Sequence, residues 1–142
     1  HIVGKCVLGN NVMIAGDVEI DECTILSSAV IVHEGCHVGK WALVKGGCRI
    51  GCNVPPFVII AHNPASYYGI NAVVMRKDGD FSESDIDDAA KAYRHIYQCS
   101  TSVFNALKRI EADIDDNAVR REVLDFIRRN NMRLVAVPMN YD

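Results

Sequence analysis

The first fifty residues carry an aliphatic side chain at every sixth position. The members of this series are Ile2, Leu8, Ile14, Ile20, Leu26, Val32, Val38, Val44 and Ile50. A period of six fits neither a helix, which buries a residue every three to four positions, nor a lone strand, which buries every second one. Six is three strand steps, so the series predicts short strands that each point one aliphatic residue inward before a corner. This pattern is typical of a parallel β-helix, whose triangular coils take three hexapeptides each.

A second series supports the same phase. It lies two residues before each large aliphatic and holds small or medium side chains, namely Cys6, Val12, Val18, Thr24, Val30, Cys36, Ala42, Cys48 and Val54. The residue after each aliphatic is most often Gly, Ala or Ser, as a tight corner beside another coil favours. His33 and Lys45 depart from that rule. His33 is expected to stack between Ala15 and Gly51, which leave space for an imidazole to reach a cleft, although a plain surface or interface histidine is an equal alternative.

The repeat is predicted to end at Val54-Pro55-Pro56, because proline cannot donate to a further ladder. We expect residues 57–61 to form a strand that leaves the solenoid, and residues 62–71 to form a polar and aromatic loop suited to binding. An extended run over residues 72–75 and a turn at Asp78-Gly79 should follow.

From Ser82 onward the apolar period becomes helical, and three amphipathic helices are predicted. Ser82 caps the first, with Phe81 and Ile86 as a hydrophobic staple; Ser100 or Thr101 opens the second, and Asn117 opens the third. The expected inward residues of the three helices are Ile86, Ala89, Ala90, Tyr93, Ile96 and Tyr97; Val103, Phe104, Leu107 and Ile110; and Val119, Val123, Leu124, Phe126 and Ile127. The arginines on the outer face of the third helix suit either solvent or an acidic partner.

Composition narrows the class of protein. The chain has 142 residues, 49% of them hydrophobic and 23% charged, with a net charge of −3. It can therefore bury a core, and the charge argues against a nucleic-acid partner. No apolar run is long enough for a transmembrane segment, and no signal peptide is recognisable. Six cysteines without a Cys-x-x-Cys pair are expected to be free thiols, which suits a cytoplasmic location.

His33 and His37 raise the alternative of a zinc enzyme, because solenoid carbonic anhydrases bind zinc through histidines at a trimer interface. Catalytic zinc needs three protein ligands, and no third histidine is in phase with this pair. We therefore expect no metal and no cofactor.

The order of motifs resembles the family of UDP-N-acetylglucosamine (UDP-GlcNAc) O-acyltransferases that begin lipid A synthesis in Gram-negative bacteria. The matching pieces are Leu8-Gly9-Asn10-Asn11, Ile14-Ala15-Gly16, Val32-His33, Gly46-Gly47, Val54-Pro55-Pro56-Phe57-Val58-Ile59, Tyr68-Gly69-Ile70-Asn71, Ala92-Tyr93-Arg94 and Ile96-Tyr97. The expected fold class is mainly β: a hexapeptide-repeat left-handed parallel β-helix over residues 1–56, a strand and substrate-loop linker over 57–79, and a small C-terminal α-helical domain over 80–142.

The resemblance implies transfer of an (R)-3-hydroxyacyl chain from acyl carrier protein to the 3-hydroxyl of UDP-GlcNAc, between the subunits of a homotrimer. The implied roles, by position, are an oxyanion contact from the backbone of Gly16; substrate contacts from Asp17, His33, Glu34, Tyr68, Gly69 and Asn71; an acyl pocket at Gly46 and Gly47; and carrier-protein docking at Arg76 and Lys77.

Several positions depart from the family pattern. Asp17 stands where many members have histidine, Glu34 where many have glutamine, and Val73 where many have glutamate. The family's general base would fall just upstream of His1, so the chain is expected to begin inside a longer solenoid and to be inactive alone, with His1 a cut end or a tag remnant. The alternatives are the N-acyltransferase of the same pathway and a non-catalytic trimeric solenoid module.

Overall fold

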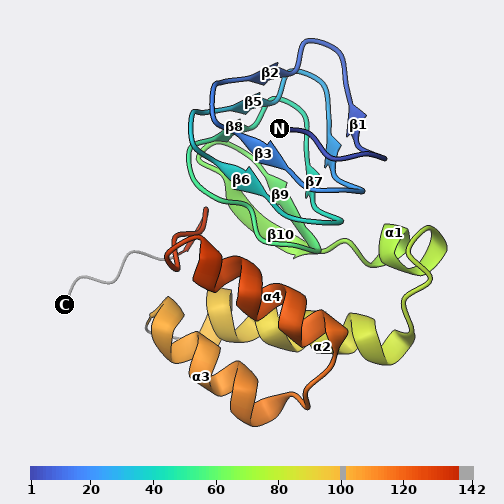
Figure 1. Ribbon diagram of the computed structural model, residues 1–142, viewed down its shortest axis with the longest axis vertical. Helices are drawn as coiled ribbons and strands as arrows, with labels where there is room; N and C mark the ends of the chain where they lie inside the picture. The colour runs from blue at the N-terminus through green and yellow to red at the C-terminus, as the bar shows by residue number, and fades with distance from the viewer. Residues whose placement is uncertain (100–101, 138–142) are drawn as a thin grey trace.

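The computed structural model describes residues 1–99 and 102–137, which form a three-sided β-solenoid and a bundle of helices packed against it (Figure 1). Up to residue 50, the sides of the solenoid are made of two-residue strands. These are β1 (Val7–Leu8), β2 (Met13–Ile14), β3 (Glu19–Ile20), β4 (Ile25–Leu26), β5 (Ile31–Val32), β6 (His37–Val38), β7 (Leu43–Val44) and β8 (Arg49–Ile50).

The strands pair in parallel with the strand three hexapeptides later. Val7 is opposite Ile25, Met13 is opposite Ile31, and Glu19 is opposite His37. Three sheets result, in the orders β1-β4-β7-β9-β10, β2-β5-β8 and β3-β6. The predicted parallel β-helix is therefore confirmed.

The interior of the solenoid follows the two predicted series. From Ile20 to Ile50 every residue of the sixfold aliphatic series is fully buried, and the second series is buried from Val18 onward. In the first coil Ile2 and Leu8 remain 47% and 42% exposed. These two residues lie in the first coil that the structure describes.

Each of the first eight corners of the solenoid has a residue in the left-handed backbone region. These residues also recur every six positions, and they are Lys5, Asn11, Asp17, Cys23, Ala29, Gly35, Trp41 and Gly47, with φ between 57° and 79°. A left-handed residue turns the chain sharply enough to start the next strand. Only two members are glycine, so this third series was not visible in the sequence.

The strand after Pro55-Pro56 stays on the solenoid, so the prediction that it leaves is wrong. β9 (Val58–Ala61) pairs in parallel with β7, Leu43 opposite Ile59. The prolines occupy a corner, where the ladder needs no donor from them; Val54 and Phe57 on either side supply the N–H groups, which donate to the carbonyls of His37 and Lys40.

The predicted loop over residues 62–71 and the extended run after it are also different in the structure. Residues 66–70 form β10 (Ser66–Ile70), antiparallel to β9 with a bulge between Tyr67 and Gly69. Alternation of a packed Tyr67 and an exposed Tyr68 is what a strand with one covered face requires. Residues 72–77 form the short helix α1 (Ala72–Lys77), because burying Met75 outweighs the strand preference of the two valines.

The three predicted helices are present. They are α2 (Glu83–Arg94), which continues as the π-helical turn η1 (His95–Cys99), α3 (Val103–Asp113) and α4 (Ala118–Arg129). Ser82 and Asn117 cap α2 and α4 as predicted, whereas α3 is capped by Ser102; Ser100 and Thr101 lie outside the described residues.

For one residue of the second helix, the prediction that its side chain points inward is wrong. Phe104 is 54% exposed, because the buried face of α3 follows Ala106, Leu107 and Ile110. Among the described residues, no helix has both the length and the apolar character that crossing a bilayer requires.

Candidate functional site

Four of the predicted site residues lie together on one corner of the solenoid, and we call Gly16, Asp17, His33 and Glu34 the corner group. All four are exposed, and the amide of Gly35 donates to the carbonyl of Gly16 at 3.2 Å. The backbone amide of His33 donates to Ile50, so His33 stacks between Ala15 and Gly51 as predicted, with its imidazole outside the solenoid.

Gly16 is the member of this group that the chain itself does not explain. A Cβ atom at Gly16 would meet nothing within 4 Å, and its φ lies outside the left-handed region. Neither packing nor backbone conformation in this chain therefore demands glycine. The open space beside its backbone is compatible with the close approach of a ligand. Asp17, in contrast, is one of the left-handed corner residues, for which aspartate is a favoured type.

A second set, the hairpin group, consists of Tyr68, Gly69 and Asn71. Tyr68 is 61% exposed and lies under the ammonium of Lys45, 4.2 Å from the ring centre. Asn71 is 3% exposed, and its side-chain amide donates to the carbonyl of Trp41 at 2.9 Å. Asn71 therefore holds the start of α1 against the solenoid. Any contact of Asn71 with substrate would have to be made by the same side chain.

The two glycines of the predicted acyl pocket form another corner. A Cβ atom at Gly46 would lie 3.2 Å from the carbonyl oxygen of Ser28, and Gly47 has a φ of +77°. Lys45, the neighbour of these glycines, carries the contact with Tyr68. The structure thus brings the predicted acyl pocket and the hairpin group to the same side of the solenoid.

The predicted docking pair lies in the last turn of α1. Arg76 binds Glu83 through two hydrogen bonds of 2.5 and 3.1 Å, which hold the pKa of the Glu83 carboxyl below its usual value. Lys77 is exposed, and no ion pair involves it in the described part of the chain. Of the two predicted docking charges, that of Lys77 is the free one.

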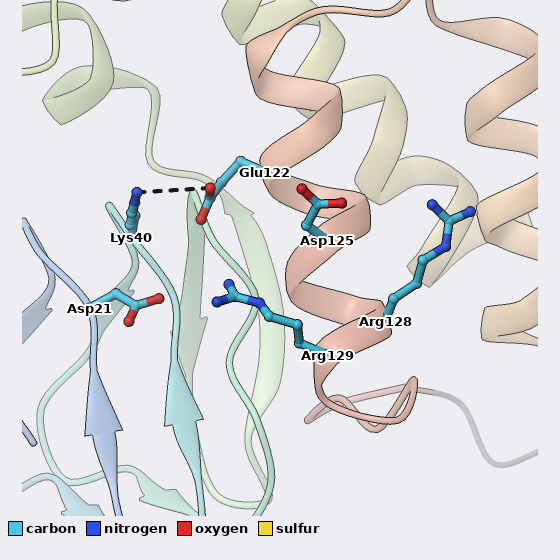
Figure 2. A pocket seen from close by; sticks show the side chains of 6 residues that line it. All are labelled: Asp21, Lys40, Glu122, Asp125, Arg128 and Arg129. Carbon is cyan, nitrogen blue, oxygen red and sulfur yellow. Dashed lines mark ion pairs between the residues drawn. The ribbon is translucent and has the colours of Figure 1, made fainter.

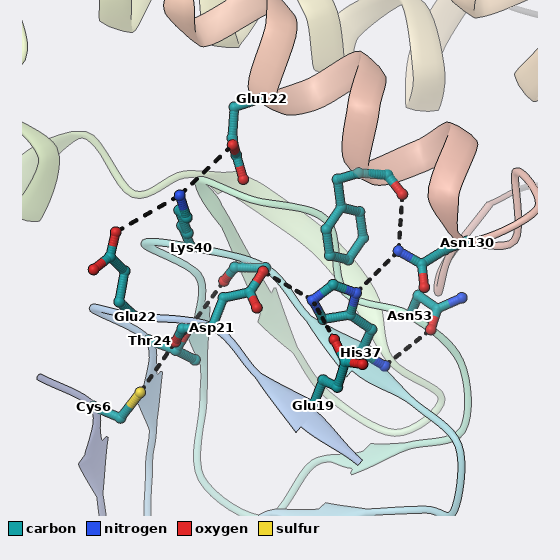
Figure 3. Close-up of polar contacts among 12 residues, drawn as sticks. Cys6, Glu19, Asp21, Glu22, Thr24, His37, Lys40, Asn53, Glu122 and Asn130 are labelled. Atoms are coloured by element: carbon teal, nitrogen blue, oxygen red, sulfur yellow. Dashed lines mark hydrogen bonds and ion pairs between the residues drawn. The ribbon is translucent and has the colours of Figure 1, made fainter. Parts of the chain in front are cut away.

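A polar cluster around His37 is one that the sequence did not predict. His37 is 7% exposed where the solenoid meets α4 (Figure 3). Its Nε2 lies 2.8 Å from Oδ2 of Asp21 and 3.6 Å from Oε2 of Glu19, while its Nδ1 lies 3.1 Å from the amide nitrogen of Asn130. The ring also packs on Phe126, with centres 4.5 Å apart. Glu19 and His37 are three hexapeptides apart, so the period could have shown that they stack.

Glu19, Asp21 and His37 have the atoms of a possible metal site, since their ligand atoms all lie within 4.8 Å of one another. The hydrogen bonds favour another use. The Asn130 amide nitrogen donates to the carbonyl of Phe126 at 2.8 Å, so the same NH₂ group faces Nδ1 of His37. Nδ1 is then an acceptor, and Nε2 carries the proton that it donates to Asp21. A metal needs the lone pair of Nε2, and the cluster therefore fits a hydrogen-bonded pair of His37 and Asp21 better than a metal.

A charged groove of about 450 Å³ lies beside this cluster (Figure 2). Asp21 and Lys40 line it from the solenoid, and Glu122, Asp125, Arg128 and Arg129 line it from α4. Lys40 lies 3.6 Å from Glu22 and 3.9 Å from Glu122, and Arg128 pairs with Glu111. The positive and negative charges that line the groove offset one another, so it does not favour a ligand of either charge. The ion pair of Lys40 and Glu122 across it links the solenoid to α4.

Comparison with known proteins places this geometry in a family. Residues 53–135 match the family model described as UDP-N-acetylglucosamine O-acyltransferase, domain 2. The chain is 38% identical over 110 residues to the acyl-[acyl-carrier-protein]--UDP-N-acetylglucosamine O-acyltransferase of Pseudomonas fluorescens SBW25, covering 77% of this chain and 42% of that protein. It is 33% identical over 130 residues to the protein of the same name in Pseudomonas putida W619, covering 91% and 48%.

Solved structures agree. A UDP-N-acetylglucosamine acyltransferase from Bacteroides fragilis superposes with a TM-score of 0.89 at 33% identity, over 97% of this chain and 52% of that one. The enzyme of that name from Francisella novicida gives 0.83 at 26% identity, over 92% and 48%. The predicted left-handed β-helix with C-terminal helices is confirmed by this likeness, and the chain spans about half the length of the relatives it matches. By sequence and by fold, the chain belongs to the UDP-N-acetylglucosamine O-acyltransferase family.

Proposed function

We propose that this chain forms the C-terminal half of an acyltransferase that moves an (R)-3-hydroxyacyl chain from acyl carrier protein to the 3-hydroxyl of UDP-GlcNAc, the first step of lipid A synthesis. The observation that carries the proposal is the family match, together with 38% identity to a relative whose name states the acyl carrier protein and the UDP-GlcNAc acceptor. The six free cysteines suit a reaction in the reducing cytoplasm.

The reaction would proceed by attack of the sugar oxygen on the thioester carbonyl carbon. The hydroxyl proton passes to a general base, the oxygen of the tetrahedral intermediate is held by a backbone N–H, and the carrier thiolate leaves and takes up the proton. Gly16 supplies the N–H in this proposal, because the space around it is open. Binding of UDP-GlcNAc does not require the general base, so binding is the property to test on these 142 residues.

The spacing of the two residue groups favours a site between chains. The corner group projects from the corner after β2 and β5, whereas the hairpin group follows β9, in the sheet of β1, β4 and β7. A cavity of about 180 Å³ beside the corner group is lined by Glu34 and by none of the hairpin residues. We propose that a homotrimer closes the cleft, with the corner group of one chain facing Tyr68 and Asn71 of the next.

Binding and mass measurements test this function. Isothermal titration calorimetry should show UDP-GlcNAc binding that weakens when His33 is replaced by Ala, and light scattering should give about three times the chain mass of 15.7 kDa. His95→Ala, which removes a histidine of η1 that pairs with Asp113 in the helical part of the chain, is the control that should bind as the wild type does. A monomer that does not bind UDP-GlcNAc would contradict the proposal.

Docking of the acidic carrier protein is proposed to use the cationic end of α1. Lys77→Ala should weaken carrier binding more than Arg76→Ala, because Glu83 already offsets the charge of Arg76. The loss should shrink as salt rises, since screening acts on exposed charges. Surface plasmon resonance with immobilised carrier protein measures both effects, and equal binding by the Lys77 variant and the wild type would remove this role.

A further inference from the structure

The cavity beside Glu34 has a lining residue that comes from the far end of the chain. Its walls are Glu34, Gly35, Cys36, Gly51, Cys52 and Asn53 from the solenoid, and Arg133 from the segment that follows α4. The helical part of the molecule therefore returns one cation to the corner at which the proposed reaction takes place.

The backbone of this returning segment is held firmly. The side-chain amide of Asn53 donates to the carbonyl of Arg133 at 2.8 Å, and the amide of Val135 donates to the carbonyl of Asn53 at 2.8 Å. Asn53 is itself fixed, because its Oδ1 accepts the backbone amide of His37 at 2.9 Å. Leu134 and Val135 are buried after it, and the amide of Arg133 donates to the carbonyl of Asn130 at 3.1 Å before it, so residue 133 is anchored on both sides.

The turn that brings Arg133 to this place is strained. Asn131 and Met132 are consecutive non-glycine residues in the left-handed region, with φ of 56° and 58°. Asparagine tolerates this conformation, whereas at Met132 it costs roughly 1 kcal/mol, and strain of this kind is often kept at ligand sites. Here its effect is to present the Arg133 side chain outward while the residues after it are buried.

The Arg133 guanidinium is available to a ligand. Arg76, Arg121 and Arg128 each form an ion pair, whereas Arg133 is exposed and forms none among the described residues. Glu34 lines the same cavity without pairing with it. One wall thus offers a cation with the fork geometry that suits phosphate oxygens, and another offers a carboxylate that can accept hydroxyl groups.

We propose that Arg133 binds the phosphate-bearing part of a substrate at the corner group, and that the Glu34 carboxylate accepts a hydrogen bond from a hydroxyl group of the same molecule. This rests on the proposed function, in which two substrates carry phosphate: the diphosphate of UDP-GlcNAc and the phosphodiester of the phosphopantetheine arm of the carrier. Asn53 is the positioning residue, because it holds the backbone of Arg133 against the solenoid.

Calorimetric titration of the 142-residue chain with UDP-GlcNAc, UDP, uridine and 4′-phosphopantetheine tests the proposal. Arg133→Ala should weaken UDP-GlcNAc and UDP binding by about tenfold or more and leave uridine binding unchanged, while Arg133→Lys should lose less. The control is Arg94→Ala, which removes an exposed arginine at the end of α2 that forms no ion pair with any residue that the structure describes. Thermal unfolding of Arg133→Ala and Arg133→Gln checks that at least one variant folds as the wild type does.

The outcomes separate the sources and the two proposals. Loss confined to UDP and UDP-GlcNAc assigns the diphosphate, and loss confined to phosphopantetheine assigns the carrier arm. Unchanged affinities in a chain that binds UDP-GlcNAc overturn the role of Arg133 and leave the proposed function standing. A wild-type chain that binds none of the phosphate-bearing probes overturns both.

Discussion

At the scale of single residues, the close approach of neighbouring coils limits which side chains fit at certain corner positions of the solenoid. A Cβ atom at Gly39 would lie 2.6 Å from the backbone nitrogen of Pro56, and one at Gly9 would lie 2.6 Å from that of Ser28. No real Cβ atom comes so near to backbone, so these two glycines are required by packing. Gly51, with nothing within 4 Å of its Cβ position, is not.

Replacing Gly39 by Ala should therefore destabilise the protein by about 1–3 kcal/mol, because the added methyl group must push two coils apart. The matched Gly51→Ala change should alter the free energy of unfolding by less than about 0.5 kcal/mol. Urea denaturation of both variants measures the difference. Equal losses would show that the coils separate more easily than the close approach implies.

His37 joins the solenoid to α4 through its contacts with Asn130 and Phe126. Its replacement by Ala leaves the Asp21 carboxylate without its histidine partner, removes one of the two contacts of the Asn130 amide nitrogen, and removes the ring from Phe126. We expect a loss of about 2–4 kcal/mol. His95→Ala, which breaks the surface pair with Asp113, should cost less than about 1 kcal/mol. Thermal unfolding of the two variants decides, and similar stabilities would mean that the His37 cluster contributes little.

At the scale of elements, what could be predicted depended on whether one period governed the residues. The sixfold series and the capping residues Ser82 and Asn117 are local signals, and the solenoid and the ends of two helices followed from them. The β9–β10 hairpin and α1 lie where the period stops, and there burial of Tyr67 and Met75 against the rest of the molecule decides the element. The His37 cluster was missed because Asn130, which fixes its proton, is far away in sequence.

The coil in which a residue lies determines what a charge costs there. Leu26 is fully buried, whereas Leu8, which occupies the same place one coil earlier, is 42% exposed. Leu26→Asp should abolish cooperative unfolding, since an unpaired buried carboxylate costs several kcal/mol. Leu8→Asp should be tolerated within about 1–2 kcal/mol. Circular dichroism with urea titration compares them, and a folded Leu26→Asp protein would contradict the burial of this series.

At the scale of the whole molecule, three tyrosines fasten the helices to the β9–β10 hairpin. The ring of Tyr67 stacks on that of Tyr97 with centres 4.5 Å apart, and the Tyr93 hydroxyl donates to the carbonyl of Pro56 at 2.6 Å. Burial raises the pKa of Tyr67 from 10 to about 12, and it raises the pKa of Tyr93 as well. The interface therefore favours neutral phenols.

This preference predicts a loss of stability in alkali. Because the pKa of Tyr67 is higher in the folded chain, its contribution is complete below about pH 10 and disappears as the pH rises toward about 12. Tyr67→Phe has no proton to lose at this position, so its free energy of unfolding should fall less steeply over that window. Urea midpoints measured from about pH 9 upward compare the two proteins. Parallel curves would show that the Tyr67 phenol ionises equally in both states.

The left-handed corner positions of the solenoid differ in how well their present residues suit that backbone conformation. Ala29 and Trp41 occupy that backbone region although their Cβ atoms make it sterically unfavourable. Asparagine or glycine would adopt the same conformation at a lower free-energy cost. Exchanging Ala29 for asparagine or glycine relaxes the turn while leaving every inward side chain in place. Substitutions intended to stabilise this solenoid are therefore best made at these corner positions, one coil at a time, before any buried residue is changed.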